Sequence, residues 1–246
     1  MSLALQTEWV KLRTTNTLVA LVAAMVGLAL LAVLLHAIAL PLQTLANVDG
    51  QLRVLVEGGE TAGVIFGALL GAMSITGEVR HGTIRPTSLA IPQRGRVIAA
   101  KSVIAVIAAL ILGTIIASVA AATGTAAMMA RGVSIHLTAG DYVHLIAGVG
   151  AGAALWAAIG LGIGAAVRSQ VPALAGIFLW LLVVENLLID SVPNVSRYMP
   201  GALARALTGA EANTLLAAPV ALTFLAAYAV VITVSGWQAI KQRDIA

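Results

Sequence analysis

The chain has 246 residues, of which 60% are hydrophobic and only 10% are charged. A soluble domain has about 45–50% apolar and about 25% charged residues, so this composition excludes a water-soluble fold. The sequence contains no cysteine, which excludes disulfides, thiolate metal sites and a cysteine nucleophile. Its net charge of +4 follows from where the basic residues lie around the apolar segments, so it does not indicate a nucleic-acid partner.

Six apolar segments are long enough to cross a membrane as helices. About 20 consecutive apolar residues are needed to span the ~30 Å hydrocarbon layer. A membrane β-barrel would instead show alternating strands of about ten residues, whereas these segments are continuous runs rich in Ala, Leu, Val and Ile. We therefore predict an all-α integral membrane protein with one transmembrane domain over residues 1–246. The expected spans are residues 17–40, 60–77, 102–128, 145–167, 171–189 and 214–237.

The basic residues predict the orientation of the chain in the membrane. Six spans place both termini on one side, together with the second and fourth connections. This side holds ten of the fourteen Lys and Arg residues, and cytoplasmic connections are the basic ones. We therefore expect both termini to be cytoplasmic. The ten residues are Lys11, Arg13, Arg80, Arg85, Arg94, Arg96, Lys101, Arg168, Lys241 and Arg243.

Two cytoplasmic segments have helical patterns of their own. Leu5, Trp9 and Leu12 recur at helical spacing within residues 2–13, which predicts an amphipathic helix in the headgroup plane or a plain lead-in to the first span. Residues 78–101 are dense in charge. Thr83 and Pro86 favour a short helix over residues 83–90, and an ordinary basic loop is the alternative.

The outer segments are also not simply polar. Pro200 and Gly201 open a run in which Leu203 and Leu207 share one helical face, which favours a short interfacial or re-entrant helix before the last span. The outer connection over residues 41–59 mixes leucines with polar residues and predicts a similar shallow helix.

Within the spans, two features stand out. Small residues recur at helix-contact spacing, which predicts close packing inside the bundle or a dimer seam. They are Gly63, Gly67, Gly71, Gly148, Gly152, Gly160 and Gly164. Glu185, beside Asn186, is the one acid expected inside a span, which makes this pair a candidate for a transport pathway or gate. A Glu that pairs helices or reaches the outer edge is the alternative.

Enzyme motifs are missing from the sequence. It has no P-loop, no H-E-x-x-H and no G-x-S-x-G motif, and no acid pair on one span that would suit an intramembrane protease. The Gly160–Gly164 run lies inside an apolar span without a preceding strand, so it does not predict dinucleotide binding. We therefore expect no enzymatic activity and no cofactor in this chain.

Three short stretches carry a family resemblance. The opening reads EWVKLR over residues 8–13. The second connection contains G-E-x-R-x-G-T-I-R from residue 77, followed by S-L-x-x-P-x-R up to residue 94. The chain closes with WQAIKQRDI over residues 237–245. With these motifs the chain resembles the membrane subunit of ABC-2 type transporters, bacterial six-span permeases related in fold to ABCG exporters. Pro86 departs from the aliphatic residue common in that family.

The resemblance implies a fold and a set of partners. It implies an amphipathic elbow helix at Glu8, Trp9, Lys11 and Arg13, and a re-entrant segment that begins near Tyr198. It also implies a coupling helix that contacts two copies of an ATPase subunit, which would bind ATP and Mg²⁺, and a second permease copy or related chain. The coupling residues would be Glu78, Arg80, Gly82, Thr83, Ile84, Arg85, Ser88, Leu89, Pro92 and Arg94.

The function implied is ATP-driven export across a bacterial plasma membrane. The cargo would be hydrophobic or amphiphilic, such as a drug, lipid or peptide. Two other classes compete with this prediction. One is an ion-coupled secondary transporter, which would use charged residues near the midplane and repeated halves. The other is a non-transporting membrane partner that shares the fold.

Overall fold

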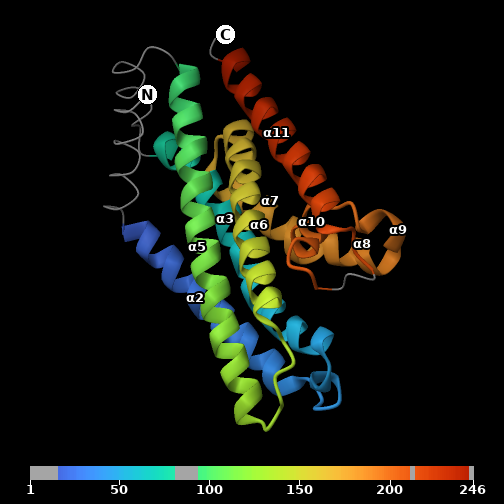
Figure 1. Cartoon of the computed structure of the whole chain (residues 1–246). Helices are drawn as coiled ribbons and strands as arrows, with labels where there is room; N and C mark the ends of the chain where they lie inside the picture. The colour runs from blue at the N-terminus through green and yellow to red at the C-terminus, as the bar shows by residue number, and fades with distance from the viewer. Residues whose placement is uncertain (1–15, 81–93, 211–213, 244–246) are drawn as a thin grey trace.

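The computed structural model describes residues 16–80, 94–210 and 214–243, drawn as coloured ribbon in Figure 1. Within these ranges every regular element is a helix, and six helical segments are long and apolar enough to cross a membrane. The predicted all-α, multi-pass membrane class is therefore confirmed. The expected elbow residues and the expected coupling helix over residues 83–90 lie outside the described residues.

Six long segments and several short helices make up the chain. The first four long helices are α2 (Asn16–Ala39), α3 (Val48–Arg80), α5 (Arg94–Ala130) and α6 (Ala139–Val167). The fifth long segment joins α7 (Gln170–Leu179), the π-helix η2 (Trp180–Val184) and α8 (Glu185–Ser191). The last is α11 (Ala218–Arg243). The short elements are η1 (Thr44–Ala46), α9 (Pro193–Ser196) and α10 (Pro200–Ala206).

Helices α3 and α6 form the centre of the bundle. The apolar window of α3 is 83% buried and that of α6 is 67% buried, whereas the windows of α2 and α11 are only 22% and 17% buried. The least apolar of the six segments, α3, is thus the most buried one. This order is expected in a membrane, because polar residues of a span face protein while apolar residues can face lipid.

Glycines let α3 and α6 approach each other closely. A Cβ on Gly71 of α3 would clash with the Ala157 carbonyl of α6, and a Cβ on Gly164 of α6 would lie 2.7 Å from the Ala72 carbonyl oxygen of α3. Gly67 and Gly160 make equally close contacts across the same interface. The prediction that these small residues pack helices inside the bundle is confirmed for these positions, which leaves none of the four free for a dimer seam.

One end of the bundle, here called the Gln51 end, is closed by side chains that bind backbone carbonyls. Gln51 is fully buried, and its Nε2 donates to the carbonyls of Leu45 at 2.9 Å and Ser134 at 2.8 Å. The backbone N–H of His136 donates to Gln51 Oε1 at 2.9 Å. Arg131 caps the last turn of α2 by donating to two of its terminal carbonyls, as suits a cation at a helix C-terminus.

The start of α3 differs from the sequence-based expectation. We expected a separate shallow helix within residues 41–59, with the second span starting near residue 60. The structure has only the three-residue η1 there, and α3 begins at Val48. The polar residues of its first turns do not end the helix, because their side chains find partners in protein, as Gln51 does with the connection between α5 and α6.

The opposite end, here called the Arg168 end, collects the end of α6, the start of α5 and the end of α11 (Figure 1). Arg168 ends α6 in the left-handed conformation, with φ of 58°. Its Nη2 donates to the Ile240 carbonyl of α11 at 2.9 Å. This bond places a cation at the C-terminal end of α11, where the helix dipole favours it.

The short helix α10 lies beside the middle of α6 rather than at its end (Figure 1). The indole Nε1 of Trp156 on α6 donates to the Pro200 carbonyl at 3.3 Å, and Gly152 of α6 faces Ala204 of α10. At 1.5 Å per residue, Trp156 lies about 25 Å along α6 from Ala139. Most of α10 is buried against this part of the bundle.

Candidate functional site

A charged cavity of about 360 Å³ lies between α3, the η2–α8 segment and α9–α10. This volume is in the range of small-molecule sites in proteins. Its walls are apolar except for a small number of polar and charged side chains. Those with the largest polar groups are Glu60, Glu185, Asn186, Ser196, Arg197 and Arg205.

The π-helix η2 places Glu185 in this cavity. The Glu185 N–H donates to the Trp180 carbonyl, five residues back rather than four. Ala173 and Ile177 form the buried face of α7, and the extra residue in the π-turn carries Glu185 onto that face. Residues after a π-turn are rotated by about 100° relative to a continuous α-helix, so Val184 would otherwise take this position. Single π-turns often occur at functional sites.

Asn186 has a different role from Glu185. Its Nδ2 donates to the carbonyls of Leu181 at 3.2 Å and Leu182 at 3.1 Å, both inside the π-helix, and its side chain is exposed. A π-turn weakens the usual ladder of backbone hydrogen bonds, and this side chain satisfies the carbonyls there. Asn186 therefore stabilises the segment that positions Glu185, although both residues line the cavity.

The carboxylate of Glu185 is held against the start of α10. Glu185 is only 3% exposed, and its Oε1 accepts the backbone N–H of Ala202 at 2.6 Å. Gly201 permits this contact, because a Cβ there would lie 2.6 Å from Oε2. The Gly201 amide and the Trp180 indole lie near the same carboxylate, but neither meets hydrogen-bond geometry with Oε2, which has no partner.

Two further acids reach this region from α3. Glu60 is 5% exposed, and the Thr61 hydroxyl lies 3.4 Å from its Oε2. Glu57, one turn earlier, lies 3.8 Å from Nη1 of Arg205 on α10, with both side chains about one quarter exposed. This ion pair is long and partly solvated, so it contributes at most about 1 kcal/mol to stability.

Arg197 brings the second cation to the cavity from the end of α9. Its guanidinium lies 5.1 Å from the centre of the Tyr198 ring, within reach of a cation–π interaction. Tyr198 in turn contacts Phe224 of α11 edge to face, with ring centres 5.7 Å apart. The Nε of Arg197 is buried and has no hydrogen-bond partner.

The cavity combines charged side chains with apolar walls. Two acids and two arginines line the cavity, so their formal charges balance when all four are ionised. In the part of the chain that the structure describes, no group of three His, Cys, Asp or Glu residues could hold a metal ion. The cavity therefore offers paired charges and apolar walls to a ligand.

Sequence reasoning found part of this site. It singled out Glu185 and Asn186, and the structure brings both to the cavity. It did not single out Glu57, Glu60, Arg197 or Arg205, so their contribution was missed. The spacing of Glu57 and Glu60, three residues apart, was the available signal, because such residues share a helix face once α3 is extended to Val48.

The structure describes no side chain of the expected coupling and elbow residues. Glu78 and Arg80 belong to the last turn of α3, and Arg94 is the first residue of α5, with only their backbone described. The others lie outside the described residues. They are Glu8, Trp9, Lys11, Arg13, Gly82, Thr83, Ile84, Arg85, Ser88, Leu89 and Pro92.

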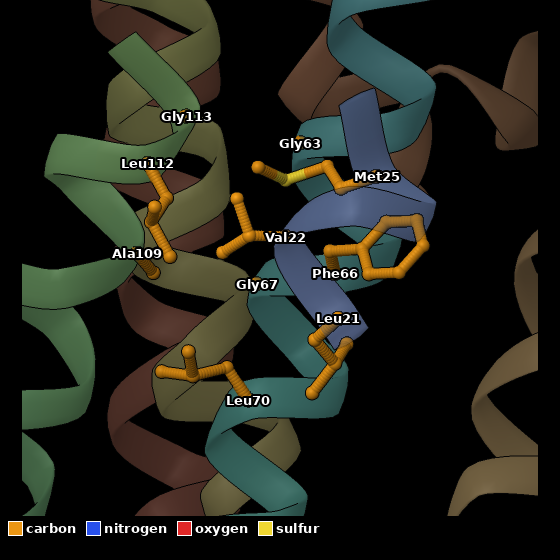
Figure 2. Close-up of a pocket in the computed structure, with 10 residues that line it drawn as sticks. All are labelled: Leu21, Val22, Met25, Gly63, Phe66, Gly67, Leu70, Ala109, Leu112 and Gly113. Carbon is orange, nitrogen blue, oxygen red and sulfur yellow. The ribbon is translucent and has the colours of Figure 1, made fainter. Parts of the chain in front are cut away.

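A second crevice lies between α2, α3 and α5, and Figure 2 shows its lining. Its walls are apolar throughout, with Met25 and Phe66 among the larger side chains. Its volume of about 10 Å³ holds at most one water molecule, so it is a packing gap rather than a binding site.

The fold and the site together define a multi-pass α-helical membrane protein with a charged cavity among its helices. Comparisons of the sequence with protein-family models and with curated proteins find no match.

Proposed function

We propose that this chain is the permease subunit of an ATP-driven ABC-2 type exporter. Two copies, or this chain and a related one, would line the transport path, and two separate ATPase subunits would bind ATP and Mg²⁺. The observation that carries the proposal is that the helices on either side of the motif meet at one end of the bundle. Helix α3 ends at Arg80 and α5 begins at Arg94 at the Arg168 end, where α11 also ends (Figure 1).

The charge distribution supports a cytoplasmic Arg168 end. The helices that end there are the ones next to the most basic connections, which carry most of the Lys and Arg residues. The Gln51 end carries acidic residues such as Asp49 and Asp141 instead. An ATPase bound at the Arg168 end would face the connection over residues 78–101 directly.

The short helices before α11 fit the re-entrant element expected of such a permease. α10 lies beside the middle of α6, and a non-spanning helix at that depth requires cover by protein or water. Most of its residues are buried, and its first carbonyl accepts the Trp156 indole. We include this re-entrant helix, and an elbow helix at Glu8 to Arg13, in the proposal.

Helix α3 offers a mechanical link between the two sites. It runs without interruption from Val48 to Arg80, a length of about 48 Å. Its last turn carries Glu78 and Arg80, and Glu57 and Glu60 lie on its first half beside the cavity. Movement of the ATPase pair at Arg80 would therefore shift the acids at the other end of the same rigid element, and ATP would supply the energy difference between two packings.

Affinity purification from the native host tests this proposal. We expect the tagged chain, solubilised in mild detergent, to co-purify with a P-loop ATPase. The double variant Glu78→Ala/Arg80→Ala should lose the ATPase or its coupled activity. Asp49→Asn, an exposed charge change at the other end of α3, should keep both. A wild-type chain that purifies without any ATPase would refute the exporter.

An ion-coupled secondary transporter is the second candidate, and one observation favours it. Glu60 and Glu185, both almost fully buried, come from different spanning segments and line one cavity. Carboxylates at such depth are typical of ion and proton pathways. Transport by the purified chain alone in vesicles, driven by an ion gradient without ATP, would favour this candidate.

A further inference from the structure

Two buried groups of opposite charge lack partners, and both belong to residues that line the same cavity. Among the residues that the structure describes, Glu185 Oε2 and Arg197 Nε are the only buried side-chain nitrogen or oxygen atoms without a hydrogen bond. One is an acceptor on an acid and the other a donor on a cation. Because both atoms belong to one cavity, we infer that their hydrogen-bond partners are missing from it.

Leaving such groups unsatisfied is unfavourable. A buried donor or acceptor without a partner costs about 1–3 kcal/mol, and more when it is charged. Other buried polar groups in the structure are satisfied, such as the side-chain amide of Gln51 with its three hydrogen bonds. We therefore expect a molecule in the cavity to supply a donor for Glu185 and an acceptor for Arg197.

The charge of the lining limits what this molecule can be. Glu60 and Glu185 balance Arg197 and Arg205, so a ligand with a single net charge would leave one sign in excess. A ligand that carries both signs keeps the balance and can satisfy both unpartnered atoms. The apolar walls, which include Val64, Ile65 and Leu215, leave room for a short apolar part.

We propose that the cavity binds a small zwitterion. Its primary ammonium group donates to Glu185 Oε2, and its phosphate or carboxylate accepts from Arg197 Nε. Two sources share this chemistry, which are the phosphoethanolamine headgroup of a membrane lipid and a free soluble zwitterion. Because Oε2 is packed beside Gly201, the Glu185 carboxylate turns about its terminal bond when the ligand binds, a rotation with a broad energy minimum.

This inference goes beyond the exporter proposal and does not depend on it, because the cavity lies within one chain. The test uses the purified full-length chain in detergent, without any ATPase. The thermal unfolding midpoint is measured with increasing glycerophosphoethanolamine, a soluble phosphodiester with no net charge, and in mixed micelles with phosphatidylethanolamine or phosphatidylcholine. A ligand that binds only the folded chain raises this midpoint in a saturable way.

We expect phosphatidylethanolamine or glycerophosphoethanolamine to raise the midpoint, and the effective one identifies the source. Phosphatidylcholine should have no saturable effect, because its methylated nitrogen has no N–H to donate. Glu185→Gln and Arg197→Gln should each weaken binding at least about tenfold, since each removes a hydrogen bond to a charged group. Asp49→Asn, an exposed change of the same kind, should bind as the wild type does.

Arg197→Gln keeps the test valid if Glu185→Gln does not fold, because among the described residues it is Glu185, not Arg197, that binds the start of α10. Three results would overturn the proposal. They are no saturable shift with either ammonium compound, equal shifts with phosphatidylcholine, and wild-type affinity in Arg197→Gln. Any of these would show that the cavity does not bind a zwitterion through Glu185 and Arg197, and none would bear on whether the chain co-purifies with an ATPase.

Discussion

Glu185 holds the start of α10 through a 2.6 Å hydrogen bond from the Ala202 N–H to its Oε1, across 17 residues of chain. The two residues belong to segments that are otherwise joined only by the short α9 and its flanking turns. A carboxylate that accepts a backbone N–H in a water-poor place makes a strong hydrogen bond. The position of α10 beside α6 therefore depends on the same side chain that lines the cavity.

Gly201→Ala should disturb this contact. The new Cβ would lie 2.6 Å from Glu185 Oε2, so either the carboxylate or the start of α10 must move. We expect a loss of about 1–3 kcal/mol in the free energy of unfolding, as for other overpacked sites. Denaturant unfolding in detergent measures it. Gly176→Ala on α7, where nothing lies within 4 Å of the new Cβ, is the control and should not lower stability. Equal effects of both changes would contradict the close approach.

Asn186→Ala should destabilise the π-helix only modestly. The change removes two hydrogen bonds, of 3.2 and 3.1 Å, to carbonyls of the same segment. Because Asn186 is exposed, water can replace part of this interaction, and we expect a loss of about 0.5–1.5 kcal/mol. The same unfolding assay checks the size. Binding of the zwitterion should persist, and its loss in this variant would show that Asn186 takes part in ligand binding.

Much of the helical layout could be predicted from the sequence, because spanning segments are set by the length of apolar runs. What the sequence could not show is which residues meet. The sequence placed Glu185 inside a span but did not show its neighbours. In the structure, Glu60 of α3 and Gly201 of α10 line the same cavity as Glu185. The π-turn that turns Glu185 inward leaves no periodic signal, since it changes the register of one turn only.

The glycines also show that the sequence predicts a close helix contact without naming the partner helix. Gly67 and Gly71 predicted a close helix contact by their spacing alone. The partner, α6, became visible only in three dimensions, because any helix with small residues could have matched. The extension of α3 to Val48 was missed for a related reason. Polar residues such as Gln51 suggested a connection, and only their burial against other segments shows that they belong to a helix.

Gly71→Ala should prevent close packing of α3 and α6. Its Cβ would clash with the Ala157 carbonyl and approach the Leu161 backbone nitrogen at 2.9 Å, and backbone atoms cannot move aside as a flexible side chain can. We expect a loss of about 3 kcal/mol or a failure to fold, at the upper end of overpacking costs. Folded yield by size-exclusion chromatography and the unfolding midpoint give the readout. Gly27→Ala on α2 has nothing within 4 Å and should fold normally, so similar yields for both variants would refute this interface.

Gln51→Leu should open the Gln51 end. The change keeps the approximate size of a fully buried side chain but removes the donor to the Leu45 and Ser134 carbonyls and the acceptor for the His136 N–H. Three backbone groups would then lose their partner, of which the Leu45 carbonyl is buried and those of Ser134 and His136 are partly open to water, so the change should cost about 1–3 kcal/mol. Hydrogen exchange of the His136 backbone amide should also become faster, because this N–H donates to the Gln51 side chain. Gln43→Leu, an exposed change in the same connection, is the control and should alter neither quantity. If the two variants unfold alike, the Gln51 side chain does not hold these connections together, and the backbone of residues 40–47 must be ordered by its own turns.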